Sequence, residues 1–314
     1  MRVFGYRAFF TALDADSQDP TLRPANRGSQ EAVGQCHIEA HYAGRMAYRL
    51  YGMSALDESV LDTRCQFGFY HGIIEMSLGE AGDDIMARGF AKRCERYADD
   101  PLRRAFCTHA LGHGLMVHYS FDLPTAAAKC TELVPSLAGK RMCYHGVFME
   151  NAFAKWGVGV SGHVSPWVDD ARPDFPCDSK LIPQEAYIIE MCYADQSLIW
   201  GRKRGGFDVR GAVDGCLRAP ASARAMCFTG LGFNMAFAMG NKTLTDAELV
   251  RSCSESPRPE DRINCLLGAI FMRSTHWWTF DGFKNPALCA ALGTDDLDAC
   301  DAYVWKQFSW LEAD

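Results

Sequence analysis

The sequence has little that would tie it to a membrane or to nucleic acid. No stretch approaches the roughly 18 consecutive apolar residues that a membrane-spanning helix needs. The formal net charge is -7 over 32 basic and 39 acidic residues, and the only short basic cluster is Arg202, Lys203 and Arg204. We therefore expect no membrane span and no nucleic-acid partner.

The motifs of the common bound cofactors are also missing. Neither a Gly-x-Gly-x-x-Gly motif followed by a strand nor a phosphate-binding Gly-Lys-Ser/Thr loop occurs, so nucleotide cofactors have no support. Cys-x-x-Cys-His is absent, which argues against covalently bound haem. No obvious nucleophile motif is present, and this absence weighs against a hydrolase.

A convincing secretory signal is lacking at the N-terminus, because Arg2, Gly5 and Arg7 interrupt the apolar residues there. The 14 cysteines nevertheless form a high and even count, which favours complete pairing in an oxidising compartment. Three explanations fit: the signal has been removed, the export route is unusual, or the thiols are reduced. We favour the first and expect an extracytoplasmic protein, periplasmic or secreted, because the cysteine spacing is regular.

Twelve of the cysteines form close pairs that repeat along the chain. A turn signal containing Pro or Gly lies near the middle of each interval, as expected for a helical hairpin with one cysteine on each arm. Antiparallel arms would bring such cysteines within the ~7 Å between Cα atoms that a disulfide tolerates. The expected disulfides, 11 to 15 residues apart, are Cys94 with Cys107, Cys130 with Cys143, Cys177 with Cys192, Cys216 with Cys227, Cys253 with Cys265, and Cys289 with Cys300.

The second arm of most hairpins carries a small residue three places after its cysteine. Glycine inside a helix costs about 1 kcal/mol relative to alanine, so its recurrence indicates close helix approach. These residues are Gly68, Ala110, Gly146, Gly230 and Gly268. The repeat predicts an all-α fold of about seven tandem helical hairpins, forming an α/α solenoid or toroid stapled by disulfides.

The repeat also predicts how the chain is organised. We expect an irregular leader at 1–34, His-rich hairpins at 35–156, a Gly/Pro-rich loop at 157–176 and His-poor hairpins at 177–314. The two sets of hairpins are expected to form one continuous domain. Cys36 and Cys65 are 29 residues apart, and their pairing stays open.

The nine histidines are concentrated in the first half of the chain, where seven lie between residues 37 and 145. A helix turns by 100° per residue, so positions two and six places after a cysteine point away from its disulfide, toward the inner face of the array. His109 and His145 occupy the first position, and His71 and His113 the second. Glu75 follows on a neighbouring part of the same face.

The C-terminal hairpins fill the same positions with other residues: Ala194, Leu198, Thr229, Phe233, Leu267 and Phe271. Histidines stacked in adjacent hairpins cost desolvation unless something binds them. His37 with His41 forms another pair four residues apart, which places two imidazoles on one helix face. The pattern therefore predicts a transition-metal site built from His37, His41, His71, His109, His113 and His145.

The donor set narrows the choice of metal. Several imidazoles suit copper, iron or zinc; Glu75 shifts the weight toward iron or zinc, and Met149 with six imidazoles toward copper. Copper or iron is favoured, and zinc stays possible. Glu75, or Glu150 near His145, is the candidate general base, because a carboxylate beside a metal can accept a proton from bound water or substrate.

Three functions compete at this point. The leading hypothesis is a metal-dependent enzyme, an oxidoreductase or oxygenase acting on a small molecule or a peptide. The first alternative is a helical-repeat scaffold that binds a peptide or protein without catalysis. The second is a metal-binding or storage protein. For His118, His163 and His276 we expect a structural role or plain exposure.

The inner helices resemble, in architecture only, those of α/α toroid enzymes such as the lanthionine cyclases. The resemblance lies in phrases such as Cys-Tyr-His-Gly at Cys143 to Gly146. It implies a central zinc held by Cys and His. The Trp-Cys motif of that family is missing, and the cysteines here are better explained as staples. The sequence therefore assigns no family.

Overall fold

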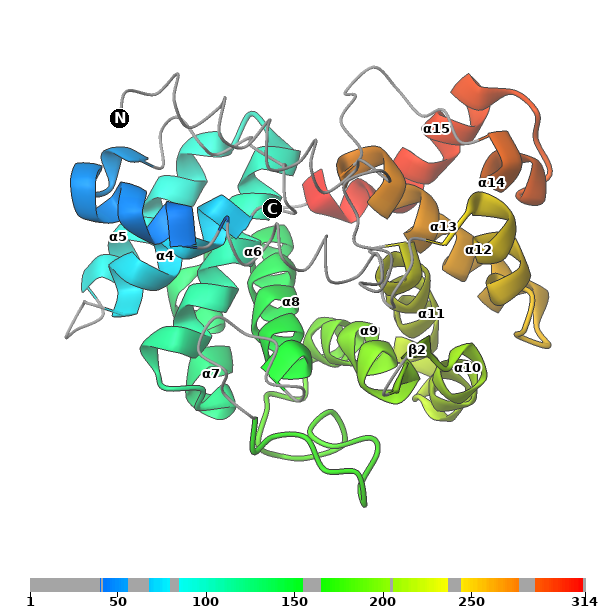
Figure 1. Cartoon of the computed structure of the whole chain (residues 1–314), viewed down its shortest axis with the longest axis horizontal. Coiled ribbons are helices and arrows are strands. Elements are labelled where there is room, and N and C mark those ends of the chain that lie inside the picture. Colours follow the sequence, from blue (N-terminus) through cyan, green and yellow to red (C-terminus); the bar gives the residue numbers. More distant parts are fainter. Residues whose placement is uncertain are drawn as a thin grey trace, which may run out of the picture. The chain divides into compact units, whose positions relative to one another are not determined.

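The computed structural model describes residues 40, 42–55, 68–79, 85–154, 165–203, 206–236, 244–276 and 286–312. These ranges are dominated by α-helices (Figure 1). The strands described are the two-residue β1 (Arg202–Lys203) and β2 (Gly206–Phe207), which pair antiparallel. The all-α prediction is confirmed. The predicted leader and the cysteines Cys36 and Cys65 lie outside the described residues.

Consecutive helices form hairpins as the cysteine repeat predicts. In five of them a disulfide joins a shorter first arm to a longer second arm. The arms are α5 (Ile85–Cys94) with α6 (Pro101–His118), α7 (Leu123–Leu133) with α8 (Leu137–Ala154), α10 (Val209–Arg218) with α11 (Ala221–Ala236), α12 (Asp246–Cys253) with α13 (Pro259–His276), and α14 (Pro286–Ala291) with α15 (Leu297–Gln307).

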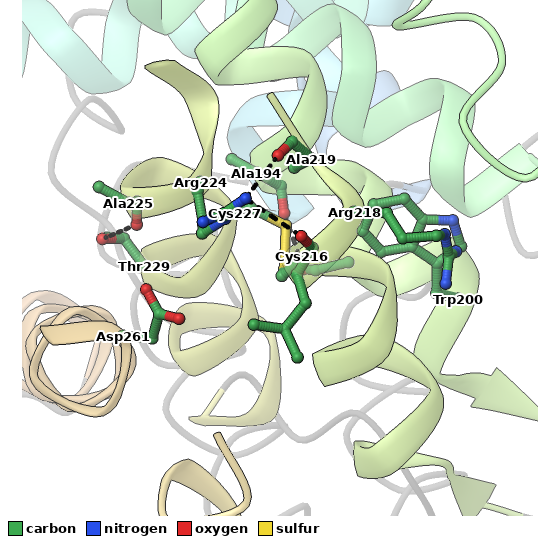
Figure 2. The surroundings of a disulfide bond; sticks show 12 residues. Ala194, Trp200, Cys216, Arg218, Ala219, Arg224, Ala225, Cys227, Thr229 and Asp261 are labelled. Atoms are coloured by element: carbon green, nitrogen blue, oxygen red, sulfur yellow. Dashed lines mark hydrogen bonds between the residues drawn. A yellow bond between two sulfur atoms is a disulfide. The ribbon is translucent and has the colours of Figure 1, made fainter. Parts of the chain in front are cut away.

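All six predicted close pairs are disulfides, with Cα–Cα distances between 5.4 and 5.8 Å. Figure 2 shows the bond between Cys216 and Cys227. Beside it, the Arg224 guanidinium donates to the carbonyls of Leu217 (3.2 Å) and Ala219 (3.4 Å) and so closes the turn between α10 and α11. Six buried disulfides fit an oxidising compartment.

The pair Cys177 and Cys192 departs from the hairpin prediction. Cys192 lies in α9 (Ala186–Gly201), but Cys177 lies in a stretch of turns that runs from residue 165 to the start of that helix. Prolines at 173, 176 and 183 explain this difference, because proline removes a backbone donor and disfavours helix at the preceding residue. The disulfide therefore ties a loop, and not a helical first arm, to α9.

Local sequence sets where several helices begin. The Asp100 carboxylate caps α6 by accepting from the backbone N–H of Arg103 (3.0 Å), and Pro101 follows in the first turn. Thr245 and Glu248 form a capping box at the start of α12. Such caps satisfy backbone donors that the first helical turn leaves without partners. No helix among the described residues is long and apolar enough to cross a membrane.

The chain divides into two compact units. Unit 1 comprises Met1–Glu150 and Val158–His163, and unit 2 comprises Asn151–Gly157 and Val164–Asp314. In unit 1 the second arms α6 and α8 adjoin each other, and α4 (Gly68–Gly79) packs against α6. In unit 2 the helices α9, α11 and α13 pack in sequence order.

Three of the recurring glycines, Gly146, Gly230 and Gly268, lie where these helices touch, which confirms the predicted close approach at these positions. A Cβ atom added to Gly146 would come closer than 3.0 Å to the His109 carbonyl oxygen of α6. In unit 2, Gly230 meets the carbonyl of Ala194 and Gly268 meets that of Thr229 in the same way. Each glycine stands three places after the cysteine of its own helix. Each carbonyl belongs to the residue two places after the cysteine of the neighbouring helix that comes earlier in the chain. The crossings in the two units therefore follow one rule.

Candidate metal centre

The helices α4 and α6 run parallel through the site. The His71 ring on α4 lies beside the His113 ring on α6, with centroids 4.5 Å apart. Further along both helices, His118 Nδ1 lies 2.7 Å from the Leu78 carbonyl, to which it donates. The two contacts advance in the same direction on both helices. Gly114 permits this packing, because an added Cβ would meet the side chains of Ile74 and Leu78 at 2.5 Å.

Three histidines from these two helices form the core of the site. One ligand atom from each of His71, His109 and His113 can be chosen so that all lie within 4.8 Å of one another. His109 Nε2 and His113 Nε2 are 3.1 Å apart. Ligand nitrogens of a tetrahedral site at 2.0–2.1 Å from the ion are about 3.3 Å apart. This pair therefore fits one edge of such a site, and His71, whose ligand atom lies within 4.8 Å of the other two, would have to move closer to complete a face.

The surroundings of the three rings differ. His71 and His113 are 7% and 3% exposed, and His109 is half-buried. The Glu150 carboxylate of α8 contacts His113 from the side away from His109, with Oε2 at 2.8 Å from Nδ1. A carboxylate on one ring nitrogen, with the other nitrogen facing further imidazoles, is the usual arrangement around a metal-binding histidine.

His145 contacts the cluster without belonging to its core. Its ring centroid lies 4.8 Å from that of His109, and it is half-buried. His145 does not belong to the set of three whose ligand atoms converge. The sequence predicts equivalent roles for four histidines of the inner face, but among the described residues the converging set holds the other three and not His145.

Glu75 is buried, with 3% exposure, and its Oε2 lies 3.1 Å from an Arg45 Nη2 in an ion pair. Arg45 belongs to a helical segment before α4, where Gly44 closely approaches the carbonyl of Phe69. Glu75 does not join the converging ligand atoms. Sequence reasoning did not identify Arg45, because nothing in its spacing marks it as the partner of a carboxylate 30 residues later.

His37, His41 and His163 lie outside the described residues, and so does the side chain of His276. His118 donates to a backbone carbonyl, which confirms the structural role expected for it. The metal site can therefore be assessed on α4, α6 and α8 alone.

In unit 2 four of the six corresponding positions hold buried apolar side chains, at Ala194, Leu198, Leu267 and Phe271, whereas Thr229 and Phe233 are partly exposed. Leu198 is fully buried, and Phe271 stacks on Phe308 with ring centroids 4.0 Å apart. The inner positions of these helices serve ordinary packing, which apolar residues do without desolvation cost. The contrast supports a specific role for the imidazoles of unit 1.

Comparisons with protein-family models, with curated proteins and with solved structures find no match. The feature of the described residues that points to a function is therefore the histidine cluster itself.

Proposed function

We propose that unit 1 binds one transition-metal ion through His71, His109 and His113, and that the protein is a metal-dependent oxidoreductase or oxygenase. The convergence of these three imidazoles within 4.8 Å is the observation on which the proposal depends. Three protein ligands leave at least one coordination position open for a small molecule, which distinguishes a catalytic site from a closed structural one.

Burial strengthens this reading. Two of the three rings are almost inaccessible to water. Burying polar rings costs desolvation free energy, and an ion bound by the three imidazoles would offset part of that cost. Unit 2 has the same helix crossings without histidines, so the fold does not require the cluster.

The donor set bears on the metal and on the reaction. Imidazole suits copper, iron and zinc, and neither thiolate nor carboxylate joins the converging atoms among the described residues. We favour copper or iron, whose redox chemistry matches the absence of a nucleophile motif, and we keep zinc as the alternative. The substrate would be a small molecule or a peptide in an extracytoplasmic, periplasmic or secreted, setting. The Glu75 carboxylate, which pairs with Arg45, is our candidate for accepting a proton.

Elemental analysis of protein purified without a His tag tests the proposal. We expect about one transition-metal ion per chain in the wild type and less than about a tenth of that in the double variant His109→Ala, His113→Ala, because losing two of three ligands removes the chelate. His118→Ala is the matched control, since this histidine lies on the same helix but binds the Leu78 carbonyl. Unchanged metal content in the double variant would reject the site.

The same samples separate the competing functions. A binding scaffold predicts no stoichiometric metal, and a storage protein predicts several loosely held ions. An enzyme of the proposed class should consume dioxygen when ascorbate supplies electrons, at a rate above that of the free ion. The double variant should not. Metal-loaded wild type with no consumption above that of the free ion would favour storage.

A further inference from the structure

We infer that Glu150 is a positioning residue of this metal site, and that it assigns Nε2 of His113 as the coordinating atom. The inference rests on the proposed function, which it deepens. The sequence suggests that Glu150 accepts a proton from the substrate. In this inference Glu150 instead accepts a hydrogen bond from a histidine that binds the metal.

The hydrogen bond between Glu150 and His113 identifies the protonated ring nitrogen. Glu150 Oε2 lies 2.8 Å from His113 Nδ1, and the two side chains are only 10% and 4% exposed. An ionised carboxylate can only accept, so Nδ1 is the nitrogen that carries the proton. A neutral imidazole has a single N–H, and Nε2 is then left with its lone pair. That atom faces His109 Nε2 at 3.1 Å, inside the cluster.

The crossing of α8 and α6 holds Glu150 near His113. Gly146 places the backbone of α8 directly against the His109 carbonyl of α6. Glu150 follows Gly146 by four residues, so both lie on the same face of α8. Because backbone meets backbone at this crossing, the distance between the helices is fixed. The Glu150 carboxylate is therefore held within hydrogen-bond distance of His113.

The imidazoles of the cluster and the residues that contact them come from different helices. Among the described residues, α4 and α6 supply the three converging imidazoles, whereas α8 supplies Glu150 to His113 and His145 to the neighbourhood of His109. A carboxylate that accepts from the far nitrogen of a ligand fixes the orientation of the ring and raises its basicity. The structure thus assigns the ion to α4 and α6, and the outer layer that orients its ligands to α8.

Replacing Glu150 should weaken metal binding without abolishing it. We expect Glu150→Ala to raise the Kd for Co²⁺, followed by its visible absorption, about 10- to 100-fold at a stoichiometry of one ion per chain. Glu150→Gln should lose less affinity, because its amide oxygen can still accept from Nδ1. Glu132→Gln is the control, since this carboxylate of unit 1 pairs with Arg88 and Lys129 on the surface. Circular dichroism checks that each variant is folded.

A second measurement reads the tautomer directly. In metal-free protein labelled with ¹⁵N-histidine, the ¹⁵N shifts of His113 should report a proton on Nδ1 in the wild type and in Glu150→Gln. In Glu150→Ala the two tautomers should both be populated. The variant His113→Ala assigns the signals. A merely structural role for Glu150 would change stability but leave the tautomer unchanged.

The outcomes separate this inference from the proposal beneath it. Loss of Co²⁺ binding in His113→Ala together with wild-type affinity in Glu150→Ala would overturn the positioning role and leave the metal site intact. Full Co²⁺ binding in His113→Ala would overturn both. A proton on Nε2 of His113 in the wild type would contradict the assigned atom, whatever the affinities are.

Discussion

At the scale of single residues, the glycines at the helix crossings fix the geometry of the site. Gly146 and Gly112 face each other across α8 and α6, and an added Cβ on either would collide with backbone of the other helix. Backbone cannot move aside as a side chain can. The identity of these residues is therefore dictated by contact between helices, and not by their own helix, in which glycine is unfavourable.

Substituting one of these glycines tests the crossing. We expect Gly146→Ala to lower the free energy of unfolding by about 1–3 kcal/mol, as overpacking does. The matched control is Gly89→Ala on α5, where an added Cβ meets nothing within 4 Å. That change should raise stability by up to about 1 kcal/mol, the difference in helix propensity. Denaturant titration measures both, and equal effects of the two variants would refute the explanation.

Some residue-level features could be read from the sequence and others could not. Counting 100° per residue from each cysteine placed His71, His109 and His113 on one surface, because helical geometry is independent of packing. The same count could not separate His145 from the other three, since the depth of each ring depends on how α6 and α8 cross. The ion pair between Glu75 and Arg45 could not be predicted either, because Arg45 belongs to another helix.

At the scale of helices and hairpins, cysteine spacing was the strongest signal. A disulfide demands a narrow range of Cα distances, so a regular interval around a turn predicts a hairpin. The rule was wrong for the first arm at Cys177, where prolines keep the chain out of a helix. Spacing reports that two cysteines meet, but it does not report which backbone brings them together.

Removing a disulfide from one hairpin should affect its own helices first. We expect Cys130→Ala with Cys143→Ala to reduce stability by about 2–4 kcal/mol and to weaken metal binding, because this bond ties α7 to the helix that carries Glu150. Removal of Cys289 and Cys300, which join α14 to α15 in unit 2, should cost similar stability and leave the metal affinity unchanged. Equal loss of affinity in both pairs would contradict this assignment.

At the scale of the whole molecule, the chain divides into two units. In both units a glycine three places after a cysteine contacts a carbonyl of the neighbouring helix, but the residues two and six places after the cysteine differ. Histidines gather at these positions in unit 1, and buried apolar residues occupy most of them in unit 2. The sequence predicted this contrast from the distribution of nine histidines. The division into two compact units lies inside α8, where no turn signal marks it, so it could not be read from local sequence.

Metal binding should therefore stabilise the two units unequally. A ligand that binds the native state slows local opening of the elements that hold it. We expect hydrogen exchange to slow on addition of the metal in α4, α6 and the first part of α8, with little change in α11 and α13. Uniform protection of both units would contradict a site confined to unit 1. The double variant at His109 and His113 serves as the control.

The unequal exposure of the histidines gives the proposed site a direction. His71 and His113 are almost fully covered, whereas His109 and His145 are half-buried. A small molecule arriving from solution would therefore reach the proposed site through the partly exposed rings of His109 and His145, and not through His71 or His113.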